Sequence, residues 1–211
     1  ASVVRLDGAN LATTFNGTGS LSATIPTGTT AVAGAHTITV HNPAPGGGTT
    51  LGNTFNVNNP APTLTSISPT TVFVGAPDTT VTFVGTNFNT QSVARRNGVD
   101  LATTLISPTQ LTAVVPAAAL ATFNTGVLVV VNPAPGGGAT AGFNFSAINH
   151  AAPTVSAVTP STMLVQSSPA NVTVTGTGFD PFTVVRFNGV DCPTSFVSST
   201  SVTATLSGAQ L

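Results

Sequence analysis

The sequence NPAPGGG occupies residues 42–48 and occurs again, letter for letter, at residues 132–138. The two copies are 90 residues apart, which is the size of a small domain. Proline fixes φ and stops a strand, and glycine reaches left-handed φ values, so the stretch predicts a sharp hairpin loop between two strands. A glycine-rich phosphate loop is the alternative. It is disfavoured because no helical pattern follows and no Lys, Ser or Thr stands in the required position.

Three longer stretches repeat with the same period. They are SVVRLDGANLATTF from Ser2, SVARRNGVDLATTL from Ser92 and TVVRFNGVDCPTSF from Thr183, so the offsets are 90 and 91 residues. A period of this length indicates tandem domains, because the units of solenoid proteins are only about 20–50 residues long.

The offsets predict one complete copy flanked by two partial copies. The complete copy, repeat two, is expected at 60–149, and its joints NNPAPT and NHAAPT are short and proline-rich, which favours semi-rigid spacing. Repeat one (1–59) is expected to lack its first strands, and repeat three (150–211) its last strands. Either the chain is a segment of a longer array, or neighbouring subunits of a polymer supply these strands. Joining one chain end to the next chain start would duplicate a region, which favours the segment.

Repeat two alternates short β-rich runs with turn residues. Seven runs are typical of strands: TLTSI, TVTFVG, SVARR, VDLATTL, QLTAVV, GVLVVVN and AGFNFS. Only PAAALATF suggests one short helical turn. About seven strands per repeat predict an all-β fold of tandem immunoglobulin-like β-sandwich modules. The buried Trp and the cysteine pair of antibody domains have no counterpart, because the sequence holds no Trp and one Cys.

Two hairpins are expected to bring opposite charges face to face. RRNGVD and RFNGVD each centre on Asn-Gly, the dipeptide that favours a two-residue type I′ turn. In such a turn Arg95 faces Asp100, and Arg186 faces Asp191. We expect both to be structural ion pairs, each contributing roughly 0.2–1 kcal/mol if exposed. A ligand-binding role for the arginines is the alternative, and the aspartate partners already account for them.

The composition argues against electrostatic partners. Only 4% of the 211 residues are charged, neither Lys nor Glu occurs, and the net charge is −1. Nucleic acids and anionic lipids both require clustered Lys and Arg, so neither is an expected partner. A net charge near zero leaves little repulsion between copies and favours association. We also expect the behaviour of such a surface to depend weakly on pH.

The residue inventory predicts neither an enzyme nor a metal or cofactor site. His36 and His41 lie five apart in one predicted strand, hence on opposite faces, and no carboxylate is near them in sequence. The five Asp are scattered singly, which gives neither a calcium loop nor a two-carboxylate hydrolase site. No GxSxG nucleophile motif occurs. We therefore expect no catalytic, cofactor-binding or metal-binding residues.

Carbohydrate stays open as a partner. Sugar-binding platforms usually present exposed Trp or Tyr, and this chain has neither. Its twelve Phe mostly fall at recurring strand or turn positions, where core packing is the expected role. No apolar run reaches the roughly 18–20 residues of a membrane span, so membrane insertion is not expected.

Repeat two differs from repeat one along one strand. Aligned on the loop, Val127, Val129 and Val131 of repeat two replace two threonines and a histidine. Because strand residues alternate between faces, these valines lie opposite the core-facing positions and form an apolar stripe. Either a long loop covers the stripe, or it is a self-association surface for another copy of the chain.

The full pattern resembles the IPT/TIG domain, an immunoglobulin-like module found in plexins, some transcription factors and many bacterial surface proteins. The matching features are PTLTSISP, GTNF and GTGF, the Asn-Gly hairpin, LTAVVP and the NPAPGGG loop. Together they cover the whole chain. The neutral, threonine-rich tandem form is most similar to secreted bacterial arrays. The resemblance implies the fold, and it brings no catalytic motif with it.

These observations lead to one expected function and one alternative. We expect an extracellular or cell-surface structural protein, part of a filament, stalk or adhesin, whose modules stack and associate with other copies of the chain. The alternative is a spacer or carbohydrate-binding region of a secreted polysaccharide-acting enzyme. A catalytic domain elsewhere in the full gene product would distinguish the alternative from the expected function.

Overall fold

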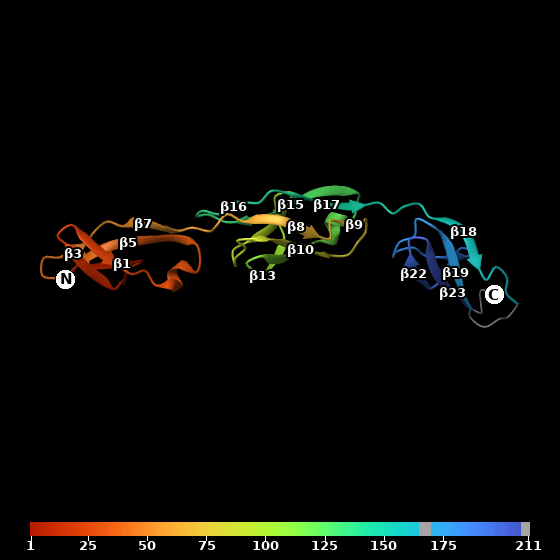
Figure 1. Cartoon of the computed structure of the whole chain (residues 1–211), viewed down its shortest axis with the longest axis horizontal. Helices are drawn as coiled ribbons and strands as arrows, with labels where there is room; N and C mark the ends of the chain where they lie inside the picture. The colour runs from red at the N-terminus through yellow and green to blue at the C-terminus, as the bar shows by residue number, and fades with distance from the viewer. Residues whose placement is uncertain (165–169, 208–211) are drawn as a thin grey trace. The chain divides into compact units, whose positions relative to one another are not determined.

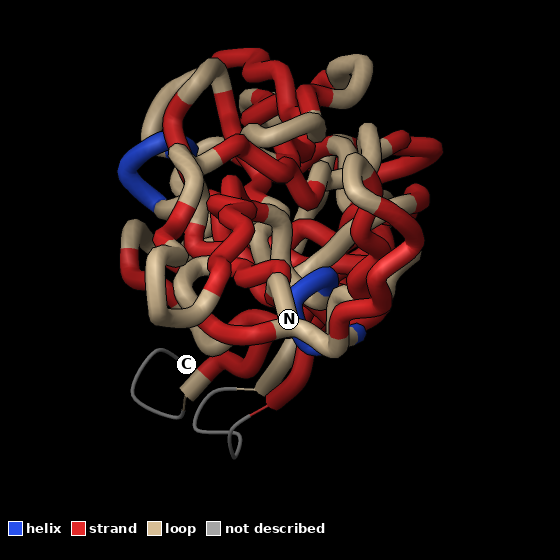
Figure 2. Tube along the Cα trace, turned by 90° about the vertical axis from the view of Figure 1, so that its left-hand side faces the viewer, coloured by secondary structure: helices blue, strands red, loops and turns tan. Residues whose placement is uncertain are grey.

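The structure, a computed structural model, describes residues 1–164 and 170–207. Its regular structure is almost entirely strand, with two short helical turns (Figures 1 and 2). The chain divides into two compact units, Ala1–Ala147 and Ile148–Leu211. No helix in the described part of the chain is long and apolar enough to cross a membrane.

Repeat two holds two antiparallel sheets. Its elements are β8 (Thr63–Ser68), β9 (Thr71–Phe73), β10 (Thr79–Thr86), β11 (Val93–Arg96), β12 (Val99–Asp100), β13 (Ala102–Ser107), β14 (Gln110–Val115), the 3₁₀ turn η2 (Ala117–Leu120), β15 (Asn124–Asn132), β16 (Gly138–Ala139) and β17 (Phe143–Ile148). One sheet has the order β13-β14-β10-β8. The other has the order β12-β11-β15-β17-β9, with β16 also paired to β15 (Figure 1).

The core of repeat two lies between these sheets. Phe83 and Leu111 from the first sheet and Leu128 and Phe145 from the second are fully buried. The alternation of buried and accessible residues along β14 and β15 is the period-two pattern of strands with one face on a core. This arrangement confirms the predicted all-β, immunoglobulin-like sandwich.

Two details of repeat two differ from the sequence pattern. The run VDLATTL is not one strand: β12 and β13 belong to different sheets, and Leu101 between them is buried in the core. The short strand β9, which is not among the predicted runs, pairs at the edge with β17. Both features depend on where the second sheet lies, which local sequence does not encode. The predicted helical turn is present as η2.

Repeat one has a large sheet and a small one. Its elements are β1 (Val3–Leu6), β2 (Ala9–Asn10), β3 (Thr13–Gly17), β4 (Ser20–Ala23), the 3₁₀ turn η1 (Thr27–Thr30), β5 (Gly34–Asn42), β6 (Gly48–Thr49) and β7 (Asn53–Val57). The larger sheet has the order β2-β1-β5-β6, with β7 also paired to β5, and β3 pairs with β4. Val4, Leu6 and Leu11 form its separate buried cluster.

In repeat three, the larger sheet is the counterpart of the sheet β13-β14-β10-β8 of repeat two. Its described strands are β18 (Thr154–Thr159), β19 (Ala170–Thr177), β20 (Arg186–Phe187), β21 (Val190–Asp191), β22 (Thr194–Ser198) and β23 (Ser201–Leu206). Four of them form a sheet of order β18-β19-β23-β22, and β20 pairs with β21. Its buried cluster includes Val202, Phe179 and Cys192.

Candidate functional site: the lead-in segments

The stretch directly before the first strand of a repeat is called its lead-in segment, residues 58–62 for repeat two and 149–153 for repeat three. The lead-in segment of repeat two is hydrogen-bonded to the NPAPGGG loop. Asn59 N–H donates to the Pro135 carbonyl (2.8 Å), and Gly137 N–H donates to the Asn59 carbonyl (2.7 Å). Asn59 and Gly136 form a parallel β-bridge. The loop therefore does more than reverse the chain: it binds the segment that enters its own repeat (Figure 1).

Two glycines make this approach feasible. Gly136 has φ of 70°, and a Cβ atom there would lie 2.6 Å from the Asn59 carbonyl oxygen. Gly137 has φ of 69°, and its Cβ would lie 2.3 Å from the Asn132 carbonyl oxygen. Both the left-handed backbone and the close contact exclude a side chain. In repeat two, this contact and the turn together account for Gly136 and Gly137.

Asn132, the first residue of the loop, also binds the lead-in segment of repeat two. Its side chain is only 1% exposed. The amide Nδ2 donates to the carbonyls of Pro60 (2.9 Å) and Asn87 (2.8 Å), and Oδ1 accepts from the Ser92 hydroxyl (2.6 Å). A buried amide with three satisfied bonds fixes three chain segments relative to one another, because each unmade bond would leave a polar group buried without a partner.

A pair of neutral amides completes the lead-in segment of repeat two. Asn89 Nδ2 donates to Asn59 Oδ1 at 2.9 Å, and Asn59 Nδ2 donates to the Pro133 carbonyl at 2.7 Å. Asn89 is held in place because its Oδ1 accepts from the Gln91 N–H at 2.8 Å. None of these groups changes its charge with pH.

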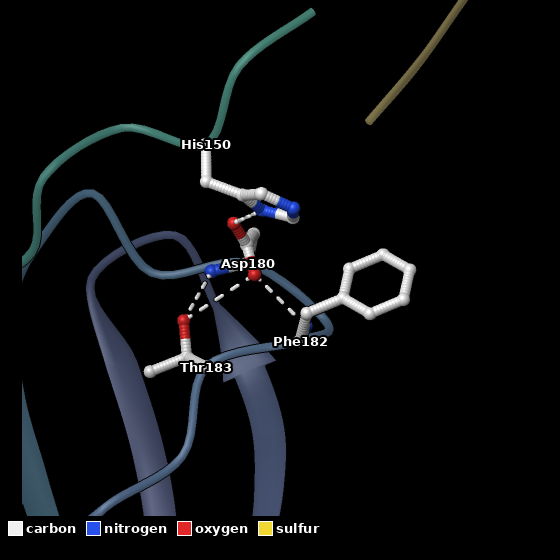
Figure 3. Close-up of polar contacts among 4 residues, drawn as sticks. All are labelled: His150, Asp180, Phe182 and Thr183. Atoms are coloured by element: carbon white, nitrogen blue, oxygen red, sulfur yellow. Dashed lines mark hydrogen bonds and ion pairs between the residues drawn. The ribbon is translucent and has the colours of Figure 1, made fainter. Parts of the chain in front are cut away.

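The lead-in segment of repeat three uses an imidazole and a carboxylate instead (Figure 3). His150 Nδ1 lies 2.6 Å from Asp180 Oδ2. Asp180 Oδ1 accepts from the Phe182 N–H at 2.8 Å, and the Asp180 N–H donates to the Thr183 hydroxyl at 2.9 Å. The Phe182 ring meets the imidazole edge to face, with centroids 5.4 Å apart. The repeat offset of 91 residues places His150 at the position of Asn59 and Asp180 at that of Asn89.

The carboxyl of Asp180 is buried, with 7% of the residue exposed. Burial acts to raise its pKa, but the hydrogen bonds from His150 and from the Phe182 amide outweigh burial and hold the pKa of Asp180 below its ordinary value. Asp180 is therefore a buried carboxylate at neutral pH, stabilised by the two donors that face it.

The hairpin arginines lie where the sequence places them. Both Asn-Gly turns have positive φ at both central residues, as a type I′ turn requires. Arg95 Nε is 2.5 Å from Asp100 Oδ1, and Arg186 Nε is 2.5 Å from Asp191 Oδ1. All four side chains are well exposed. We therefore still expect each ion pair to contribute only a small free energy of stabilisation.

The valine stripe is partly covered by the chain itself. Val127 is 42% exposed, whereas Val129 and Val131 are half-buried. Gly142 lies directly over the stripe, because a Cβ atom there would be 2.3 Å from Val127 Cγ1. Arg95 is the register partner of Val129 on the neighbouring strand β11, so its ion pair borders the stripe. The stripe is thus a narrow apolar strip with a charged edge.

The two histidines of repeat one each contact a single polar side chain. His36 Nδ1 is 2.7 Å from Asp7 Oδ2, although the two residues are 29 positions apart, and His41 contacts the Thr49 hydroxyl at 3.0 Å. The Thr37 amide and then His36 lower the pKa of Asp7. Within residues 1–164 and 170–207, no group of three His, Cys, Asp or Glu side chains could hold a metal ion.

Sequence reasoning missed the amide network and the exposed aromatics. Phe15, Phe123, Phe182 and Phe196 are 42–65% exposed, so the expectation that Phe mostly fills the core fails for a third of the twelve. The His–Asp pair had a readable signal, since Asn59 and Asn89 change together to His150 and Asp180 at one offset. Such paired substitution between copies is a mark of contact.

Comparison with known proteins gives a family and several structural neighbours. The family model of the IPT/TIG domain matches residues 62–147 and 153–210. IPT/TIG and immunoglobulin-like folds are in general non-catalytic domains. A comparison with curated proteins gives no match.

Among solved structures, the plexin A4 extracellular region is 20% identical to the chain, with a TM-score of 0.40 over 73% of this chain and 16% of plexin. The SGBP-B protein of the Bacteroides ovatus mixed-linkage glucan utilisation locus, in complex with a heptasaccharide, is 13% identical, with a TM-score of 0.35 over 98% of this chain and 51% of that one. The I9–I11 tandem of titin is 10% identical, with a TM-score of 0.33 over 89% and 68%. The chain spans less than two thirds of the first two proteins.

Proposed function

The chain belongs to the IPT/TIG domain family, and on that premise we propose that it is an extracellular structural protein built from modules in a row. Its repeats, 1–59, 60–149 and 150–211, are modules of a surface filament, stalk or adhesin. Three separate buried clusters, one in each repeat, support this division. The chain itself performs no catalysis.

The observation that carries this proposal is the docked lead-in segment of repeat two. A free tether between modules would leave its backbone groups to water, whereas Asn59 makes two backbone and two side-chain hydrogen bonds with the repeat it enters. Pro60 extends the restraint, because its carbonyl accepts from the buried Asn132. A joint of this kind favours transmission of length and direction along an array, which is what a stalk or filament requires.

Self-association is the second part of the proposal. The near absence of charge removes long-range repulsion between copies, and the valine stripe offers the contact. The stripe is small, so we expect it to work through repetition along an array and not as a strong isolated dimer contact.

Substitution of Val129 by Asp is expected to abolish lateral assembly while leaving the fold intact. A carboxylate in the half-buried centre of the stripe would have to be desolvated when a second copy docks. Thr39 occupies the equivalent position of repeat one, so Thr39→Asp is the matched control and is expected to assemble normally. Sedimentation velocity reports assembly, and circular dichroism reports the fold. Val129→Asp material that still assembles would remove the stripe as the interface.

Carbohydrate binding is the second candidate function, and the exposed phenylalanines favour it. Phe123 and Phe182 are 63% and 51% exposed, and aromatic faces are the usual stacking surfaces for sugar rings. The chain would then be a spacer or glycan-binding region of a secreted polysaccharide-acting enzyme. Binding of soluble glucans that is lost in Phe123→Ala or Phe182→Ala supports this candidate over the structural one.

A further inference from the structure

The lead-in segments of repeats two and three are built on the same plan with different chemistry. In repeat two, the side-chain amides of Asn59 and Asn89 form a neutral hydrogen bond of 2.9 Å. In repeat three, His150 meets Asp180 at 2.6 Å from the equivalent positions. The supporting bonds are the same in both: the amide two residues after Asn89 or Asp180 donates to its side chain, and a hydroxyl three residues after accepts from its N–H.

We propose that the lead-in segment of repeat three is a pH-dependent latch, closed when His150 is protonated against the buried Asp180 carboxylate and loosened when His150 is neutral. The lead-in segment of repeat two, with its amide pair, has no such dependence. One chain would therefore carry one permanently docked lead-in segment and one that responds to acidity. This inference concerns a contact inside residues 148–211 and holds whether or not the chain assembles with other copies.

Groups of Phe182 and Thr183 border the contact between His150 and Asp180. Around them stand the Phe182 ring and amide and the Thr183 hydroxyl, none of which titrates near neutral pH (Figure 3). The other charged side chains of the described part of repeat three, Arg186 and Asp191, pair with each other at 2.5 Å. Cys192 is buried in the core cluster.

The sign of the pH effect follows from the two groups separately. Asp180 has a lowered pKa, so its stabilising contribution is present above the ordinary value of 3.8 and is lost only as pH falls through the lowered value. Near neutral pH the change must therefore come from the imidazole, the side chain that ordinarily titrates between about pH 5 and 8. Imidazolium facing carboxylate makes a charge-assisted bond, about twice as strong as the neutral bond that replaces it at higher pH.

The test is nuclear magnetic resonance of the ¹⁵N-labelled chain between about pH 5.5 and 8, the range of imidazole titration. The backbone amide of Ala151 reports the lead-in segment of repeat three, and the amide of Asn59 is the internal reference in the same sample. We expect the heteronuclear NOE of Ala151 to fall as pH rises, with the undocked fraction increasing about fivefold because the charge-assisted bond is lost. The Asn59 amide should stay unchanged.

The matched variant is His150→Asn combined with Asp180→Asn, which gives repeat three the amide pair of repeat two. Because that pair already stabilises a folded lead-in segment in this chain, the variant is expected to fold, with Ala151 ordered equally at both pH values. Asp180→Asn alone is expected to lose most of the response, since no carboxylate then faces the imidazole. An Ala151 amide that behaves identically at both ends of the range in the unmodified chain would overturn the latch. So would a response that persists in the double variant.

Discussion

Replacing Asn132 with alanine is expected to destabilise repeat two by about 3 kcal/mol, because the substitution removes all three hydrogen bonds of this buried amide and leaves the buried Ser92 hydroxyl without its Asn132 partner. The same residue of the repeated loop, Asn42, is exposed in repeat one. Asn42→Ala is therefore the matched control, and its expected effect is under about 0.5 kcal/mol.

Hydrogen exchange is the appropriate measurement, since the chain has no Trp or Tyr to report unfolding by fluorescence. Amides of β14 and β15 report the stability of repeat two, and amides of β1 and β5 report repeat one. Equal, small effects of Asn132→Ala and Asn42→Ala would show that the buried amide network does not hold the lead-in segment in place.

Substitution of Gly85 by alanine is the second change with a large expected effect, also about 3 kcal/mol against repeat two. A Cβ atom at Gly85 would lie 1.9 Å from the Thr63 carbonyl oxygen and 2.7 Å from Phe88 Cζ. The register between β10 and β8 shifts between Val84 and Gly85, which brings the two backbones together there. Its φ lies outside the left-handed region, so the penalty is steric: β8 or the Phe88 ring must move.

The control for Gly85→Ala is Gly19→Ala, because a Cβ atom at Gly19 meets nothing within 4 Å. Thermal unfolding by circular dichroism, with hydrogen exchange to identify the repeat that opens, separates the two variants. Gly176 stands at the equivalent position of repeat three. A Cβ atom there would lie 1.8 Å from the Thr154 carbonyl oxygen, so Gly176→Ala should destabilise repeat three in the same way. A Gly85→Ala chain as stable as the Gly19→Ala chain would refute this explanation of the GTNF and GTGF motifs.

The parts of the fold that the sequence predicts well are local. The Asn97–Gly98 turn determines its own register, so Arg95 and Asp100 could be paired from sequence alone, and the structure has that register. The alternation along β15 and the helical turn η2 likewise follow from the local sequence, the turn from the stretch Pro-Ala-Ala-Ala-Leu.

The parts that the sequence did not predict depend on contacts between distant segments. Asn59 and Pro133 are 74 residues apart, and Ser92 and Asn132 are 40 apart, so nothing near either residue reveals its partner. An Asn in a proline- and glycine-rich stretch is typical of a turn, and its burial becomes clear only when the lead-in segment docks against the loop. Comparison of the repeats position by position was the one available signal, since His150 and Asp180 change together.

The most direct test of the modular array is electron microscopy of the native material. If the chain is a stiff structural array, the images should show a polymer with a regular axial repeat of roughly 35–45 Å per module, the length of a strand of about 10 residues plus its loops. Separate short rods without axial or lateral order would contradict the filament and would favour a spacer that carries another domain.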